Sequence, residues 1–180
     1  VMSITISSSI ALAPLSISDA EAIFPLIDSD RENLGRYLDW VDSVTDIETT
    51  RGYLQRRIKS GLNGAAWYKI EFNHTIVGVF GIKVVRQSRA CAEVGYWLHS
   101  DYQGNGIVTQ TVTGFCEHLQ AEGLIQRVEI QCLAENKASI AVALRLGGRQ
   151  TGTIPNYRII NDVPQTLKIY TVKLSNYRHN

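Results

Sequence analysis

Cysteine is scarce in this 180-residue sequence, which contains three, and no two of them form a C-x-x-C pair. Cys91, Cys116 and Cys132 are odd in number and widely separated, so they favour reduced core thiols over disulfides or zinc ligands. The four histidines lack metal-ligand spacing, and neither an H-E-x-x-H motif nor an acidic calcium loop is present. The sequence therefore predicts no metal site and a reducing, cytoplasmic location.

Charge imbalance and long apolar runs are absent as well. Eighteen basic residues stand against 17 acidic ones, and the net charge of +1 gives no electrostatic reason to expect nucleic acid or an anionic membrane as a partner. No apolar run approaches the ~20 residues of a membrane-spanning helix, and no basic segment followed by an apolar run begins the sequence. We therefore expect no direct contact with nucleic acid or membranes and no export.

No repeat, low-complexity tract or linker rich in proline and glycine divides the chain. Hydrophobic residues make up 44% of it, which is enough for one sizeable core. We therefore expect a single domain over residues 1–180.

The N-terminal third has the pattern of a strand followed by helices. Alternating apolar residues predict a strand near residues 10–15. Residues 18–21 and 45–48 resemble capping boxes, and each precedes residues with helical spacing. Pro25 shortens the first helix, and Gly61 ends the second.

The rest of the chain alternates between strand and helix patterns. Segments 65–72, 75–85 and 91–98 are rich in β-branched and aromatic residues and predict an antiparallel meander, with Asn73-His74 as a tight turn. A helix is predicted over 107–121, ended by Gly123. A strand at 127–133, a helix at 137–146 and a hairpin of 149–160 with 165–174 around Asn161-Asp162 complete an α+β order.

Two glycines lie just ahead of the predicted helix 107–121, in the loop Gln103-Gly104-Asn105-Gly106. Such a loop lets several backbone N–H groups converge on one anion, and the helix dipole favours phosphate there. The glycines alone are equally typical of a sharp turn. The order of strand, loop, helix and strand favours a phosphate site, although the third glycine of a dinucleotide motif and the lysine of a Walker A loop are missing.

Four motifs in sequence order resemble the GNAT family of N-acetyltransferases, and within it the RimL-like branch that acetylates the N-termini of ribosomal proteins. They are Gly-Tyr-Trp-Leu at 95–98, Tyr-Gln-Gly-Asn-Gly-Ile-Val-Thr at 102–109, Arg-Val-Glu-Ile at 127–130, and Asn-Lys-Ala-Ser at 136–139. The resemblance implies a mixed, mostly antiparallel central sheet with splayed central strands flanked by helices. It also implies acetyl-CoA as cosubstrate and no metal, and a homodimer is left open.

The resemblance further implies which residues hold the cosubstrate. The strand ending at Trp97 and Leu98 would pair with the pantetheine arm, and the loop after it would hold the pyrophosphate. Asn136 would contact the cosubstrate, although asparagine also suits a helix N-cap. Ser139 would lie near the CoA sulfur, although its hydroxyl would equally cover the first helical turn. The predicted cofactor-binding residues are Trp97, Leu98, Gln103, Gly104, Asn105, Gly106, Ile107, Val108, Thr109, Asn136 and Ser139.

Acetyl transfer needs a neutral amine, a polarised thioester and a proton for the departing thiolate. An α-amine has an ordinary pKa of about 7.7–8.0, so mild base assistance or desolvation is sufficient. Glu93 is the candidate base, acting through water, because its strand borders the proposed thioester; the alternative is an ordinary strand-surface carboxylate. Ser139 is the candidate acid, because the tyrosine found in many GNAT enzymes seven residues after the asparagine is Ala143 here.

The expected activity is transfer of acetyl from acetyl-CoA to a primary amine by direct attack, with a protein N-terminal α-amine as the first choice of acceptor. A small-molecule amine is the alternative acceptor. Ala143, together with Thr151 in place of a glutamate of the RimL-like branch, also leaves open a catalytically silent acyl-CoA-binding domain. Four aromatic residues, Tyr37, Trp40, Trp67 and Tyr68, are candidates either for an acceptor cleft or for the core.

Overall fold

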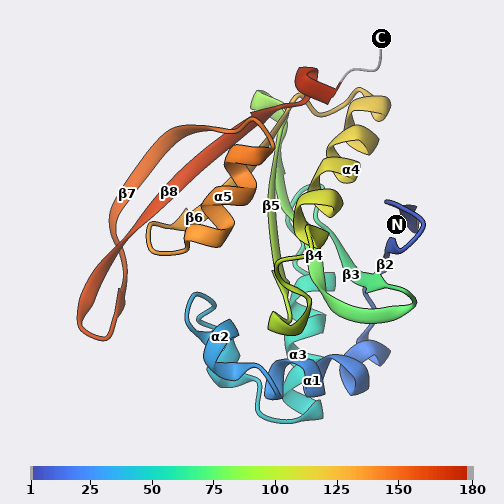
Figure 1. Ribbon diagram of the computed structural model, residues 1–180, viewed down its shortest axis with the longest axis vertical. Coiled ribbons are helices and arrows are strands. Elements are labelled where there is room, and N and C mark those ends of the chain that lie inside the picture. The colour runs from blue at the N-terminus through green and yellow to red at the C-terminus, as the bar shows by residue number, and fades with distance from the viewer. Residues whose placement is uncertain (1, 178–180) are drawn as a thin grey trace.

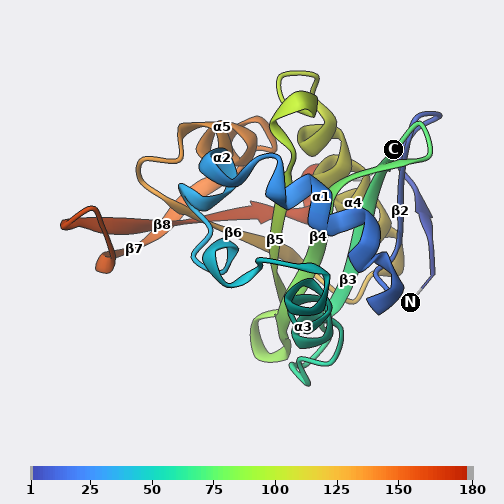
Figure 2. The same cartoon turned by 90° about the horizontal axis from the view of Figure 1, so that it is seen from below.

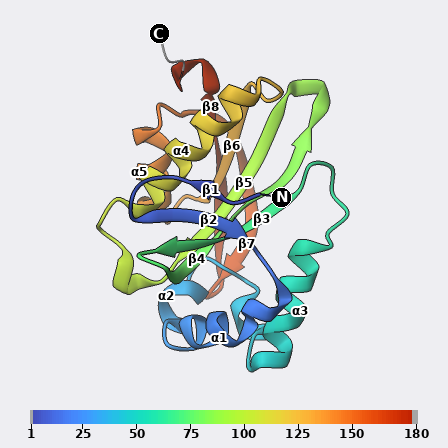
Figure 3. The same cartoon turned by 90° about the vertical axis from the view of Figure 1, so that its right-hand side faces the viewer.

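The computed structural model describes residues 2–177, in which eight strands form one sheet with helices packed on both faces (Figures 1 and 3). The strands are β1 (Ile4–Thr5), β2 (Ile10–Pro14), β3 (Ala66–Phe72), β4 (Thr75–Arg86), β5 (Cys91–Leu98), β6 (Arg127–Leu133), β7 (Arg149–Ile160) and β8 (Val163–Lys173). The helices are α1 (Ala20–Asp28), α2 (Arg31–Gly35), α3 (Ile47–Ile58), α4 (Ile107–Glu122) and α5 (Lys137–Arg145). This confirms the predicted α+β class, while β1 and α2 were not predicted.

The strand order is β1-β2-β3-β4-β5-β6-β8-β7, and every neighbouring pair is antiparallel except β5 with β6. The predicted meander of β3, β4 and β5 is confirmed, with Asn73 and His74 at φ of 48° and 67° in its first turn. Asn161 and Asp162 take similar values of 50° and 61° between β7 and β8. Positive φ at both central residues of a two-residue turn suits the twist of a hairpin.

The two parallel strands separate partway along their length. β5 pairs with β6 only from Cys91 to Val94, although β5 continues to Leu98 and β6 continues to Leu133. Beyond Val94, the edge of β5 that faces β6 has no strand partner. The predicted splay of the central strands is therefore confirmed, and it opens the sheet in the direction of the α4 N-terminus.

Each face of the sheet has its own core. α4 and α5 cover one face, where Phe115 packs edge-on against Phe80 with ring centroids 4.8 Å apart. α1 and α3 pack on the other face, around buried residues such as Ile23 and Leu54 (Figure 3). Alternation along β5 sends Val94 to the first core and Trp97 to the second. The strand that splays is thus anchored on both sides.

The helix starts in the N-terminal third differ from the prediction by one or two residues. The first capping box is formed by Ser16 and Asp19, two residues ahead of the predicted pair. The second is formed by Asp46 and Thr49, one residue later than predicted. Both stretches contain several Ser, Thr and Asp residues that can cap, so spacing alone does not choose among them.

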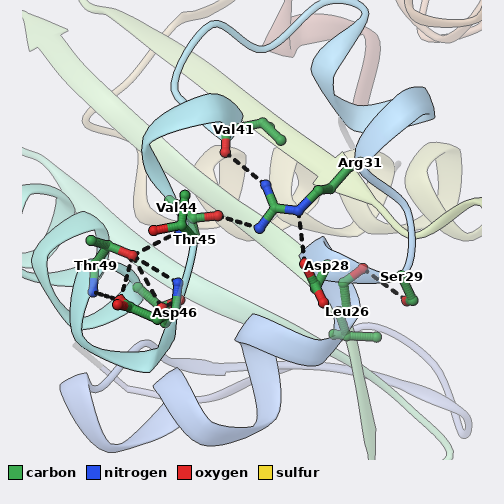
Figure 4. A network of polar contacts seen from close by, with 10 residues as sticks. Leu26, Asp28, Ser29, Arg31, Val41, Val44, Thr45, Asp46 and Thr49 are labelled. Atoms are coloured by element: carbon green, nitrogen blue, oxygen red, sulfur yellow. Dashed lines mark hydrogen bonds and ion pairs between the residues drawn. The ribbon is translucent and has the colours of Figure 1, made fainter.

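Arg31 fixes the segment between α2 and α3 (Figure 4). Its guanidinium forms an ion pair of 2.8 Å with Asp28 and donates to the carbonyls of Val41, at 3.1 Å, and Val44. Asp46 follows directly and caps α3 through Thr49. One side chain therefore holds the second half of the connection, which directly follows Asp39 and Trp40.

The β7–β8 hairpin extends well beyond the other strands (Figures 1 and 2). β7 is an edge strand, and Ile159 and Val163 near its tip are 68% and 56% exposed. Close to the tip, Arg158 ties the hairpin to the body of the protein by donating to the carbonyl of Tyr37 at 2.9 Å. The hairpin therefore forms a wall beside the opening between β5 and β6.

Candidate active site

The glycine loop has the geometry of an anion site. Gly104 and Gly106 have φ of +81° and +72°, and the first amide to donate within α4, at 2.9 Å to Gly106, belongs to Gln110. The amides of residues 107–109 consequently have no partner within the helix, as at any α-helix N-terminus. The Gln103 side chain donates to the carbonyl of Leu98 at 3.2 Å and ties the loop to the end of β5.

A cavity of about 690 Å³ opens at this loop. It is lined by ten of the eleven predicted cofactor-binding residues, namely Trp97, Leu98, Gln103, Gly104, Gly106, Ile107, Val108, Thr109, Asn136 and Ser139. The exception is Asn105, whose side chain turns back to the carbonyls of Tyr102 and Gln103, both at 3.4 Å. The structure thus gathers residues from β5, α4 and α5 around one space.

Three cationic side chains also line this cavity, and the sequence interpretation had not included them. Arg36 follows α2, while Lys137 and Arg145 lie on α5. Glu135 is the one acidic residue in the lining. Positive side chains beside free helical amides suit a ligand with several phosphates. A single Lys or Arg in the sequence gives no sign that it will lie beside a phosphate site, because the other members of that site come from distant segments.

A second cavity, of about 250 Å³, lies on the other side of the splayed strand. It shares six residues with the first cavity, namely Tyr37, Leu38, Tyr96, Trp97, Asn136 and Ser139. Two ligands entering from opposite sides would therefore meet at these residues. Of the four candidate aromatic residues, Tyr37, Trp40 and Trp67 line the second cavity, and Tyr68 belongs to the core.

Ser139 lies where the cavities meet and has two polar neighbours. Its Oγ is 2.7 Å from the Tyr96 Oη and 3.3 Å from the Cys132 Sγ. Burial raises the pKa of the Tyr96 phenol, and the hydrogen bond to Ser139 offsets only part of that rise. Burial likewise raises the pKa of the Cys132 thiol. Both neighbours therefore stay protonated near neutral pH, so each can donate a hydrogen bond to the Ser139 Oγ.

Asn136 is the N-cap of α5, as one of its two interpretations predicted. Its Oδ1 accepts from the Ser139 amide at 3.2 Å. Asn136 lines both cavities as well, so the capping role does not remove it from the site. The cap also fixes the first turn of α5, which sets the position of the Ser139 hydroxyl.

Glu93 lies on β5 but lines neither cavity. Its carboxylate is 2.7 Å from Arg86 and 3.9 Å from Lys83. Arg86 also lies 3.5 Å from Glu129, the residue opposite Glu93 on β6. Its neighbour Lys83 does line the second cavity. The predicted base role of Glu93 stays a prediction.

The two departures from the family pattern have clear positions. Ala143 is fully buried on α5 and touches neither cavity, whereas Thr151 lies exposed on β7 and is 2.8 Å from the Thr171 hydroxyl. A tyrosine hydroxyl nevertheless reaches Ser139, supplied by Tyr96 on β5 in place of α5. The motif Gly-Tyr-Trp-Leu contained this residue, but sequence could not show that β5 and α5 would meet there.

An aromatic brace holds the β5 segment that both cavities share. Trp97 Nε1 donates to the buried Tyr53 hydroxyl on α3 at 3.0 Å. Trp40 stacks on Tyr53 with ring centroids 4.1 Å apart. Because Trp97 is fixed by a second layer of aromatic rings, the backbone beside Tyr96 is positioned before any ligand binds.

Two features that other functions would require are absent from the described residues. None of the helices in residues 2–177 is long and apolar enough to cross a membrane. Over the same residues, no group of three or more His, Cys, Asp and Glu side chains is arranged to hold a metal ion.

Comparison with known proteins gives the family. Residues 9–149 match the model of the acetyltransferase (GNAT) domain, so this chain belongs to the GNAT acetyltransferase family. The predicted enzyme class, fold and acetyl donor are confirmed at this level. The ribosomal-protein-serine acetyltransferase of Escherichia coli (strain K12) is 27% identical over 168 residues, which cover 93% of this chain and 94% of that protein.

Solved structures agree with this assignment. RimL, the ribosomal L7/L12 α-N-protein acetyltransferase, in complex with coenzyme A superposes with a TM-score of 0.87 at 28% identity, over 95% of this chain and 97% of that one. The microcin C7 self-immunity acetyltransferase MccE, in complex with acetyl-CoA and AMP, has a TM-score of 0.85 at 26% identity, over 93% and 94% of the two chains.

Proposed function

We propose that this protein transfers acetyl from acetyl-CoA to the α-amine of a protein N-terminus, as its ribosomal-protein-modifying relatives do, and that it acts in the cytoplasm. The observation that carries the proposal is the meeting of two cavities at Ser139 and Tyr96. A donor bound along the α4 side and an amine arriving from the other side would react there.

The larger cavity fits acetyl-CoA in its chemistry. The free amides at the start of α4 and the cations Arg36, Lys137 and Arg145 suit the phosphates. The unpaired edge of β5 from Gly95 to Leu98 offers backbone groups to the amides of the pantetheine arm. These features support the predicted cofactor residues as a donor site that ends at Ser139.

The reaction requires one bond to form and one to break. The neutral amine nitrogen bonds to the thioester carbon, the carbon–sulfur bond then breaks, and the sulfur leaves with a proton from the Ser139 hydroxyl. The Tyr96 Oη lies 2.7 Å from the Ser139 Oγ, and a hydrogen bond donated by Tyr96 would stabilise the charge that develops there until solvent returns the proton to Ser139. The proton lost by the attacking nitrogen passes to water, with Glu93 as the predicted acceptor beyond that water.

A small-molecule amine is a second candidate acceptor. The observation that favours it is the similarity to MccE, whose complex contains AMP beside acetyl-CoA. The acceptor-side cavity of about 250 Å³ accommodates one or two residues of a peptide or a compact small molecule.

A thiol-release assay tests the proposal. The protein is mixed with acetyl-CoA and either peptides that begin with serine, matched peptides with a blocked N-terminus, or small amines. We expect CoA release with free but not blocked peptides. CoA release with small amines but not with peptides would show that the acceptor is a small molecule. If the protein binds CoA by calorimetry but releases none with any amine, it is a catalytically silent domain.

A further inference from the structure

The acceptor-side cavity has an unusual set of charges. Arg57 on α3, Lys83 on β4 and Arg158 on β7 all line it, and Asp39 is its one acidic residue. These side chains come from four separate parts of the chain and converge on about 250 Å³. The imbalance is local, because the whole chain is nearly neutral.

The one acidic residue is already paired. Asp39 lies 3.8 Å from the Arg158 guanidinium, which also donates to the Tyr37 carbonyl. Arg57 has aromatic neighbours instead, since its guanidinium lies 5.0 Å from the centroid of Tyr53 and 5.3 Å from that of Trp67. Among residues 2–177, no carboxylate lies within 4.0 Å of Arg57.

Lys83 is also short of negative charge. Its nearest carboxylate, Glu93 at 3.9 Å, is bound more closely by Arg86. Desolvation by the cavity walls lowers the pKa of Lys83, Glu93 opposes that shift, and the positive charge of Arg57 lowers the pKa further. Lys83 still keeps 46% of its side-chain surface accessible, because it borders the open cavity. Arg57 and Lys83 therefore place like charges in the lining of one cavity, and an anion bound there would offset their repulsion.

We infer that the acceptor carries an anionic group a few bonds from its amine, and that this group binds against Arg57 and Lys83. For a protein acceptor, the group is the carboxylate of an Asp or Glu among the first residues after the N-terminus. The inference rests on the proposed function, because it concerns the acceptor of that same reaction. The faces of Trp67 and Tyr53 behind Arg57 reduce hydration of the guanidinium and so strengthen its attraction for a carboxylate.

The test uses hexapeptides that begin with serine and carry aspartate at the second, third or fourth residue, each paired with an asparagine peptide of the same shape. We expect kcat/KM for the aspartate peptide to exceed its asparagine partner by about tenfold at one of these positions, the effect of one charge-assisted hydrogen bond. Equal values at all three positions would overturn the inference.

Variants show which side chains produce the preference. Lys83→Gln and Arg57→Gln should each reduce the aspartate-to-asparagine ratio toward one, whatever they do to the absolute rate. Lys173→Gln is the matched control, since Lys173 is exposed at the end of β8 and lines neither cavity. A ratio that survives in both cavity variants would also contradict the inference.

Further measurements distinguish failure of this inference from failure of the proposed function. Equal kcat/KM values for aspartate and asparagine peptides would contradict the inference but would still support the proposed function. A small primary amine that carries a phosphate is compared with the matched amine that lacks it. Dependence of the rate on the phosphate, without an aspartate preference in peptides, would overturn the acidic peptide as the source of the anion. If no amine is acetylated, calorimetry measures the affinity of acetylated aspartate and asparagine peptides in the presence of CoA. Tighter binding of the aspartate peptide would support the inference, and equal binding would overturn it.

Discussion

At the scale of single residues, the central feature is a hydroxyl pair formed by side chains 43 positions apart. Tyr96 and Ser139 are 2.7 Å apart where the two cavities meet. Each side chain also belongs to the framework of the fold, because Tyr96 lies on the central strand β5 and Ser139 lies in the first turn of α5. Their proposed roles in proton transfer can therefore be distinguished from structural roles only by substitutions that preserve shape.

Ser139→Ala should lower turnover by roughly 10²–10⁴-fold, with little change in CoA affinity, if the hydroxyl donates its proton only as the carbon–sulfur bond breaks. Tyr96→Phe should lower turnover by about tenfold. The double variant should be no slower than Ser139→Ala, because both hydroxyls act through one proton. Tyr68→Phe is the control, since Tyr68 is a buried tyrosine outside both cavities. If turnover of Ser139→Ala stays within a factor of two of the unsubstituted protein, Ser139 has only a structural role in the first turn of α5.

The predicted base role of Glu93 has a pH-dependent consequence. Glu93→Gln keeps the shape and removes the basicity, so the rate at limiting acceptor should fall near neutral pH. It should recover partly at alkaline pH, where the amine is already neutral. Glu129→Gln is the control, because Glu129 lies opposite on β6 and binds the same Arg86.

Parallel pH profiles for the two glutamine variants would assign Glu93 to the Arg86 network alone. Activation of the amine would then depend on its surroundings. Arg57 and Lys83 line the acceptor side, and positive charge there disfavours the protonated form of an incoming amine. The acceptor cavity itself would lower the pKa of the amine that enters it.

At the scale of elements, the proposed donor site depends on the turn into α4. Gly106→Val places a β-branched side chain at a φ of +72°, where the helix begins, and CoA affinity should fall at least about tenfold as amide contacts to phosphate are lost. Gly123→Val is the control, because Gly123 caps the other end of the same helix at +76° with open space around it. Calorimetric titration with CoA should show weak binding in the first variant only. Similar losses in both would point to a general effect on α4.

Elements and loops could be predicted where the physical cause is local. The positive φ at Gly106, the cap at Asn136 and the turn at Asn161-Asp162 all follow from what single residues permit. The contact of Tyr96 with Ser139 depends on the splay after Val94, which long-range packing sets. The place of Lys83 in a cationic cavity could not be predicted, because it depends on Arg57 and Arg158, which lie on other elements.

At the scale of the whole molecule, one sheet links the two ligand sides, and we propose that it organises a single domain over residues 1–180. The first core joins β4, β5 and β6 to α4 and α5, and the second joins the meander to α1 and α3. Loss of packing in either core would disturb the splayed strand between them. Overall stability and the geometry around Ser139 are therefore connected. A pH at which buried side chains ionise should affect both.

Alkaline pH should unfold the protein through its buried thiols and phenols. Burial raises the pKa of Cys116 from 9.0 to about 12 and that of Tyr177 from 10.0 to about 12, and it also raises those of Cys91 and Cys132. Because the folded state keeps these protons while the unfolded chain loses them, the stability that the neutral groups contribute is complete below about pH 9 and is lost above it. Each group adds up to about 1.4 kcal/mol per pH unit to the slope.

Urea unfolding at pH 8, 9 and 10 measures that slope. Cys116→Ala should lower the free energy of unfolding at pH 8 but make its decline toward pH 10 shallower, because one buried thiol no longer ionises on unfolding. Val112→Ala removes a comparable buried group from the same helix without removing a titratable one, so it should lower stability and keep the original slope. The same decline in both variants would show that Cys116 does not couple folding to pH. A shallower decline in Cys116→Ala alone would identify its thiol as one of the groups through which alkaline pH opens the core behind the donor site.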